Sequence, residues 1–248
     1  MEFAYSIILF FAAFIPGIFI IKLRKPLKFD LKYLLVFAGA FIFSITIVHL
    51  LPELFTASEH PQLIGLFVVV GFFMQVFLDF ITTGVEHGHL HHHDHHHRGF
   101  SPIMLIIGLC IHAFMDGSIL VHPGGVNEAG HSSTGLLIGI VLHKIPAAIA
   151  LMSILNLNIK NRQILLTFLL IFSLASPIGL FFSEVLNQNN IIDKEGFLIV
   201  FAVVSGNFLH ISTTIYFESS PDHTFHKKKI FISLIGALLA IAVEFLHH

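Results

Sequence analysis

Two short segments in the middle of the chain place ionisable side chains inside long apolar stretches. The first runs from His112 to Asp116 (HAFMD), and the second runs from His143 to Ala147 (HKIPA). Ionisable groups at the depth of a bilayer are costly, so they usually mark a functional site. Imidazole nitrogens and carboxylate oxygens are also ligands that zinc-like cations prefer. These segments therefore predict a site for a divalent metal ion inside a membrane protein.

The composition and the pattern of hydrophobicity predict what must position these residues. Of the 248 residues, 55% are hydrophobic and 11% are charged, whereas a soluble domain carries about 25% charged residues. A transmembrane helix requires roughly 20 mostly apolar residues. We therefore predict an all-α, polytopic integral membrane protein, a single transmembrane domain over residues 1–248. Eight transmembrane helices are expected, at about 3–21, 33–52, 63–84, 101–121, 134–155, 163–186, 197–217 and 229–246.

The distribution of lysine and arginine predicts the orientation. With both termini outside, 11 of the 13 basic residues fall on the cytoplasmic side, which is the side that basic loops prefer. Lys194 then lies outside and Lys144 lies within the membrane. We expect a multi-pass protein of the plasma (inner) membrane.

A histidine tract separates the third and fourth apolar segments, in a loop at 85–99. Clustered imidazoles bind zinc, copper, iron and nickel without a fixed geometry. The alternatives are a polar linker that is merely rich in histidine, or an engineered tag. We predict that the tract binds metal on the cytoplasmic side, where it would collect, buffer or sense ions. Its histidines are His87, His89, His91, His92, His93, His95, His96 and His97.

The intramembrane residues are spaced so that they can meet. His112 and Asp116 are four residues apart and share one helix face, while His143 falls near the middle of the next, antiparallel segment. A single intramembrane histidine is more often a helix-to-helix hydrogen bond, but three such groups at matching depth favour a metal site. The fourth position is left open between water, Ser176 and His210. Pro146 also leaves the carbonyl of residue 142 without its helical partner, beside His143.

These segments resemble signatures of the ZIP family of zinc- and iron-regulated-transporter-like metal transporters. His112–Gly117 (HAFMDG) is similar to the HxxxEG or HxxxDG signature of the family's fourth helix, and His143–Pro146 (HKIP) to the start of its fifth-helix signature. His49–Glu53 (HLLPE) resembles a segment of the family's second helix. Eight spans, external termini and a histidine-rich third loop are also family features. The resemblance implies uptake of zinc, iron or manganese into the cytoplasm, through a site that the fourth and fifth helices share.

The chain departs from the family pattern in three places. Family members with two adjacent metals carry an Asn after the fourth-helix His, an Asp after the fifth-helix His and a bridging Glu on the fifth helix. This chain has Ala113, Lys144 and Ala147 there. We therefore predict one transport site, with Lys144 as a charge surrogate for the second metal that pairs with Asp116. The alternative is that Lys144 extends away from the site or is deprotonated.

Two further acidic positions belong to the expected ion path. His49 and Glu53 lie one turn apart at the outer end of the second segment, where they would raise the local cation concentration. The alternative is an ordinary solvated helix end. Asp79, near the cytoplasmic end of the third segment, would lie on the exit route, or else be a solvated interfacial residue.

The sequence-based hypothesis is a divalent cation importer that works by alternating access. Its cargo would be Zn²⁺, with Fe²⁺, Mn²⁺ and Cd²⁺ as alternatives, and we expect no enzyme activity, no cofactor and no nucleic-acid partner. Its partners are the metal ions and the lipid bilayer, and a homodimer is left open. A competing hypothesis is an integral-membrane metalloenzyme, although HExxH is absent and the ligands lie at mid-bilayer. A cation-diffusion exporter, which needs a cytoplasmic domain, and a metal sensor without flux are two more competing hypotheses.

Overall fold

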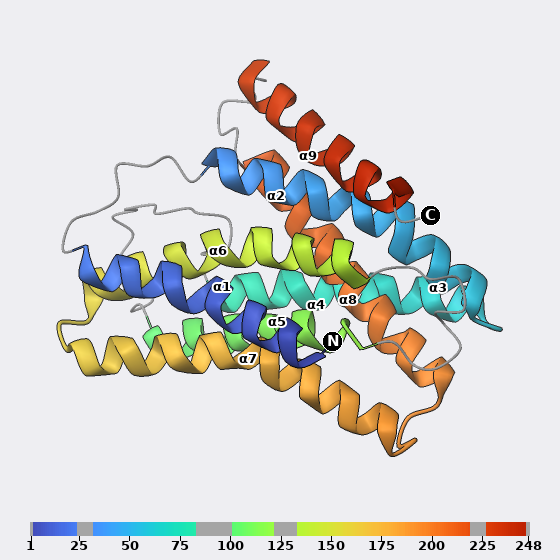
Figure 1. Cartoon of the computed structure of the whole chain (residues 1–248), viewed down its shortest axis with the longest axis horizontal. Helices are drawn as coiled ribbons and strands as arrows, with labels where there is room; N and C mark the ends of the chain where they lie inside the picture. The colour runs from blue at the N-terminus through green and yellow to red at the C-terminus, as the bar shows by residue number, and fades with distance from the viewer. Residues whose placement is uncertain (1, 24–31, 83–100, 122–132, 219–226, 247–248) are drawn as a thin grey trace.

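The computed structural model describes residues 2–23, 32–82, 101–121, 133–218 and 227–246. Within these ranges every regular element is helical, which confirms the all-α prediction (Figure 1). The histidine tract lies outside the described residues. The helices are α1 (Glu2–Lys22), α2 (Lys32–Ile45), the π-helical turn η1 (Thr46–Leu50), α3 (Leu51–Ala57), α4 (Pro61–Thr82), α5 (Pro102–Ser118), α6 (Ser133–Asn158), α7 (Arg162–Gln188), α8 (Lys194–Glu218) and α9 (Lys227–Leu246).

Six helical segments in the described part of the chain are long and apolar enough to cross a membrane. They are α1, the continuous run α2–η1–α3, α4, α6, α7 and α8. α5 is apolar but has only 17 residues. The second segment runs to Ala57, beyond the expected end at residue 52. Pro52 does not end the run: it stands in the first turn of α3, directly after the π-helical turn η1.

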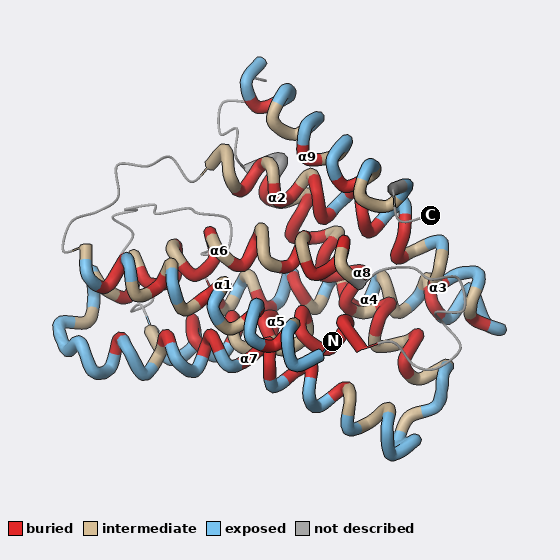
Figure 2. The backbone as a smooth tube through the Cα atoms, viewed as in Figure 1, coloured by how far each residue is buried: buried red, intermediate tan, exposed pale blue. Residues whose placement is uncertain are grey.

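The helices pack in two groups, and one hydrophobic core cluster includes residues of both. In one group, α1 packs along α6 and α7, and α5 packs along α7. In the other, α4 packs along α8, and α2 packs along α8 and α9. The groups meet chiefly where α2 contacts α6 and where α4 contacts α5. Figure 2 shows buried residues on the facing sides of the helices and exposed residues on the outer sides.

The outward faces are apolar, as lipid contact requires. On α4, Phe73, Phe77 and Phe80 are each at least 60% exposed. An exposed apolar surface of this kind is unusual in a soluble protein and marks contact with a membrane or a partner. The fold therefore has apolar residues on both its inner and its outer faces, which agrees with the low proportion of charged residues.

Glycines bring two helix pairs into backbone contact. A Cβ on Gly71 would meet the carbonyl of residue 203, and a Cβ on Gly206 would meet the carbonyl of residue 68, so α4 and α8 approach reciprocally. Gly117 and Gly179 do the same for α5 and α7, against the carbonyls of residues 176 and 114. Small residues permit such close packing between membrane helices. The second contact fixes the height of α5 against α7 close to Asp116.

Candidate metal centre

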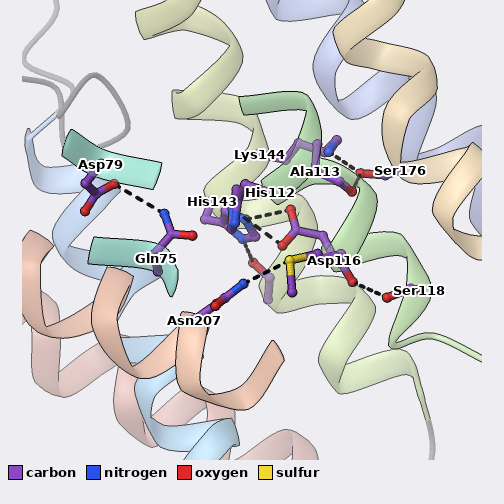
Figure 3. A network of polar contacts seen from close by, with 12 residues as sticks. Gln75, Asp79, His112, Ala113, Asp116, Ser118, His143, Lys144, Ser176 and Asn207 are labelled. Carbon is purple, nitrogen blue, oxygen red and sulfur yellow. Dashed lines mark hydrogen bonds and ion pairs between the residues drawn. The ribbon is translucent and has the colours of Figure 1, made fainter. Parts of the chain in front are cut away.

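Three predicted ligands converge between α5 and α6. His112 and Asp116 come from α5 and His143 comes from α6, and all three side chains are buried (Figure 3). Nε2 of His112 lies 3.5 Å from Oδ1 of Asp116, and Nε2 of His143 lies 3.3 Å from Oδ2 of the same carboxylate. One ligand atom from each residue can be chosen so that all three atoms lie within 4.8 Å of one another. The described residues contain no other such group of His, Cys, Asp and Glu.

The α6 backbone orients the His143 ring. Nδ1 of His143 lies 3.1 Å from the carbonyl oxygen of Gly139, one turn earlier on α6. A carbonyl only accepts, so Nδ1 carries a proton, and in the neutral ring Nε2 keeps its lone pair. That lone pair faces the side where Asp116 lies. Such an outer hydrogen bond is the usual way to fix the tautomer of a metal-ligating histidine.

The spacing of the three groups fits a zinc-like cation. Zinc bonds to nitrogen and oxygen are about 2.0–2.2 Å long, so neighbouring ligands of a tetrahedral ion lie about 3.3–3.6 Å apart. The 3.5 and 3.3 Å separations fall in this range. Nδ1 of His112 and Oδ1 of Asp116 are buried without a hydrogen-bond partner in the described part of the chain. A cation among the three groups would compensate the buried carboxylate, whose charge is otherwise costly in an apolar interior.

Lys144 is directed to α7. Its ammonium donates a hydrogen bond to Oγ of Ser176, whose hydroxyl in turn donates to the carbonyl of Ala113. The ammonium also lies 5.2 Å from the centre of the Phe172 ring, and its charge acts electrostatically on Asp116. Lys144 is buried rather than extended to a membrane surface. The Ser176 hydroxyl, a predicted candidate for the fourth ligand, therefore has two partners already.

The second side chain predicted for the fourth position, His210, also has a partner. Nδ1 of His210 on α8 lies 3.2 Å from Oδ2 of Asp79 on α4, and Gln75 donates a 3.3 Å hydrogen bond to Oδ1 of Asp79. Asp79, predicted on the exit route or as a solvated residue, is thus part of a largely buried polar cluster between α4 and α8. Figure 3 shows Gln75 and Asp79 on the side of the three ligands away from Lys144.

Asn207 is a site residue that the sequence did not single out. It is fully buried on α8, and its Nδ2 donates to Sδ of Met115 at 3.3 Å. Its Oδ1 has no hydrogen-bond partner among the described residues. Figure 3 places the amide close to His143 and Asp116. The available signal was an Asn inside an apolar stretch, because an amide buried there without hydrogen-bond partners is costly.

A third polar cluster lies at the C-terminal end of α2. The π-helical turn η1 carries His49, whose Nε2 lies 3.5 Å from Oε2 of Glu53. Its Nδ1 lies 2.8 Å from Oε1 of Glu244 on α9. π-helical turns are rare in proteins, and those that occur often lie at functional sites. The outer cluster thus has three members: the predicted pair, His49 and Glu53, and Glu244. Glu244, a single carboxylate in the last apolar segment, was not predicted.

Comparisons with known proteins agree with the sequence signatures. The family model described as ZIP Zinc transporter matches residues 86–244, which include α5 to α9. Zinc transporter ZIP9 of Xenopus tropicalis is 32% identical over 178 residues, which are 65% of this chain and 55% of that protein. Zinc transporter ZIP9 of Micropogonias undulatus is 32% identical over 170 residues, 62% of this chain and 52% of that protein. Protein zntD of Dictyostelium discoideum is 30% identical over 161 residues, 61% of this chain and 23% of that protein.

The chain spans about half the length of the ZIP9 proteins that it matches. The family match nevertheless covers more than half of this chain and includes both segments that supply the clustered ligands. With the all-helical fold and six helices able to span a membrane, it assigns the chain to a family: the protein belongs to the ZIP family of zinc transporters.

Proposed function

We propose that this protein carries divalent metal ions, with Zn²⁺ as the favoured cargo, across a membrane and into the cytoplasm. The ion binds His112, Asp116 and His143 during passage. The observation that carries the proposal is the convergence of two imidazoles and one carboxylate at zinc-like separations on two adjacent helices. Two nitrogen ligands favour zinc over manganese. The names of the related ZIP9 proteins support the same cargo.

The proposed topology has eight spans and external termini. We add α5 and α9 to the six long helical segments, which gives eight spans. The 17 residues of α5 are at the lower limit for crossing about 30 Å of hydrocarbon. Lys227, Lys228 and Lys229 begin α9 at the end expected to face the cytoplasm. The protein would then lie in the plasma (inner) membrane, with the histidine tract in the cytoplasm.

The proposed ion path passes three clusters. His49, Glu53 and Glu244 attract the cation at the outer end, because acidic groups at a mouth raise the local cation concentration. The ion then reaches the central ligands and leaves past Asp79 and His210 towards the histidine tract. An inside-negative potential of 100 mV would supply about 4.6 kcal/mol for a divalent ion that moves inward.

Lys144 supports a single central metal. A buried ammonium beside the site repels a second cation, and Ala113 and Ala147 supply no further carboxylate or amide ligand. Its hydrogen bond to Ser176 fixes the charge on the α7 side of α6. The fourth coordination position is then filled by water or by the side-chain amide of Asn207, which lies close to the three ligands (Figure 3).

Zinc uptake into proteoliposomes tests the proposal. The wild-type chain should load a trapped zinc-sensitive dye at a rate that rises with an inside-negative potential. His112→Ala should reduce this rate at least tenfold, because it removes one of three protein ligands. His60→Ala, which changes an exposed histidine at the start of α4, is the matched control and should transport as the wild type does. Equal rates in His112→Ala and the wild type would exclude the central site from the mechanism.

Direction is tested in cells. Cells that express the chain should accumulate zinc in the cytoplasm, and iron, manganese and cadmium should be compared in the same assay. Loss of cytoplasmic zinc would identify an exporter. Zinc binding without any change in cytoplasmic zinc would identify a sensor.

A further inference from the structure

An apolar groove opens on the outside of the helix group that does not carry the central ligands. It lies between α2, α8 and α9 and has a volume of about 380 Å³, which is within the range of small-molecule sites. Phe43 of α2 and Leu234 of α9 line it and are 41% and 54% exposed, so it opens towards the surroundings of the protein. None of the central or outer metal ligands lines it.

The groove is effectively apolar although hydroxyl side chains line it. The Ser212 hydroxyl donates to the carbonyl of residue 209, Thr213 donates to the same carbonyl, and Ser233 donates to the carbonyl of residue 230. Each of these hydroxyls thus donates its proton to its own helix. With these three hydroxyls engaged, most of the surface left for an occupant is aliphatic or aromatic, which suits a hydrocarbon chain.

Four lysines lie beyond one end of the groove. α2 and α9 lie side by side and begin at the same end of the molecule (Figure 1), with Lys32 as the first residue of α2 and Lys227, Lys228 and Lys229 as the first residues of α9. Lys32 and Lys229 lie close enough to repel each other electrostatically. Lys227 and Lys228 are exposed. An anion at this end would relieve the repulsion among these charges.

The depth of the groove matches one leaflet. At 1.5 Å per helical residue, the lining positions Val36 to Ser44 lie about 6–18 Å from Lys32 along α2. Half of a bilayer's hydrocarbon core is about 15 Å thick. An acyl chain whose headgroup sits at the lysines would therefore run along the groove within its own leaflet.

We propose that this groove is a binding site for an anionic phospholipid, with the phosphate at Lys32 and Lys227–Lys229 and one acyl chain between α2, α8 and α9. Basic pockets beside membrane helices bind anionic headgroups in this way. The site does not depend on metal transport. A lipid bound there would anchor the α2–α4–α8–α9 group in the surrounding leaflet.

Native mass spectrometry of the purified full chain tests the proposal. The protein is equilibrated in detergent with equal amounts of phosphatidylglycerol and phosphatidylcholine that carry identical acyl chains. The wild type should retain at least about 25-fold more phosphatidylglycerol, because each of the two exposed lysines contributes about fivefold. The double variant Lys227→Gln/Lys228→Gln should lower that retention by about fivefold for each lysine and leave phosphatidylcholine unchanged. Lys160→Gln, an exposed lysine between α6 and α7, is the matched control and should behave as the wild type.

Variants that fill the groove test the acyl chain. Ala237→Trp on α9 and Ala40→Phe on α2 each place a large side chain among the lining residues and should lower the retention of both lipids. Leu239→Trp, an exposed residue of α9 outside the groove, is the control. Equal retention of the two lipids by the wild type, or full retention in both filled variants, would overturn the proposal. A dimer that dissociates in the filled variants would instead identify the groove as an interface between two copies.

Discussion

Replacing Asp116 by Asn tests the central site most directly. The carboxylate lies between the two imidazoles, 3.5 Å from His112 and 3.3 Å from His143, and is the only acidic group of the cluster. The amide has the same shape but no charge. Changes to groups that only support a metal ligand lower affinity by about 10–100-fold. Loss of the ligand's charge should therefore lower zinc affinity by about 100-fold or more.

This loss converts into a measurable change in stability. A free zinc concentration 100 times the dissociation constant stabilises the folded wild type by about 2.7 kcal/mol, whereas a 100-fold weaker site gains only about 0.4 kcal/mol at the same concentration. The zinc-dependent stabilisation should thus fall by about 2.3 kcal/mol. Without zinc, Asp116→Asn should be at least as stable as the wild type, because burying an amide is less costly than burying a carboxylate.

Thermal unfolding in detergent, with zinc and with a chelator, measures both effects. The histidine tract is replaced by a Gly/Ser linker in every chain, so that the central site alone binds zinc. Asp193→Asn, an exposed residue before α8, is the control and should keep the full zinc-dependent shift. If Asp116→Asn also keeps the full shift, the carboxylate is not a zinc ligand. If it loses stability equally with and without zinc, Asp116 has a structural role and the reasoning is wrong.

Three further predictions concern the surroundings of the site. In the chain whose histidine tract is replaced by a Gly/Ser linker, the double variant Lys144→Asp/Ala147→Glu restores two carboxylates of two-metal relatives. It should raise the zinc stoichiometry from one to two in equilibrium dialysis, and an unchanged value of one would contradict the surrogate role. His49→Ala should raise the zinc concentration for half-maximal uptake severalfold and leave the maximal rate unchanged, whereas a reduced maximal rate alone would place His49 elsewhere in the mechanism. Gly206→Ala forces a Cβ against the α4 backbone and should destabilise the protein by about 1–3 kcal/mol in denaturant titration. Gly65→Ala, whose Cβ would meet only a 3.8 Å contact, is its control, and equal effects would refute the packing argument.

The clustering of residues that share a helix, or that lie on helices adjacent in the sequence, was predictable. His112 and Asp116 are one turn apart on any helix, and His143 lies at a similar depth on the next segment. The hydrophobic pattern located each helical segment, because a stretch of roughly 20 apolar residues is enough to identify a membrane helix. The structure brings together the same three side chains that the spacing selected.

The partners from distant segments were not predictable. Glu244 reaches His49 from almost 200 residues later in the chain, and Asn207 reaches Met115 from α8. These contacts depend on how α2 packs on α9 and how α8 packs near α5, which a one-dimensional pattern does not specify. The π-helical turn at His49 is a similar case, since its local sequence also suits an ordinary helix.

The placement of the ligands bears on how access could alternate. His112, Asp116 and His143 all belong to the α1–α5–α6–α7 group, and the glycine contact between Gly117 and α7 fixes α5 within that group. The other group faces the site with Asn207 and with Phe208, whose ring lies 6.2 Å from that of His143. If one helix group moved past the other, the distances among His112, Asp116 and His143 would stay the same. The residues of the other group that face them would change. The cation could then stay bound to the same three side chains while the open side of the site changes, because the ligands move as one body.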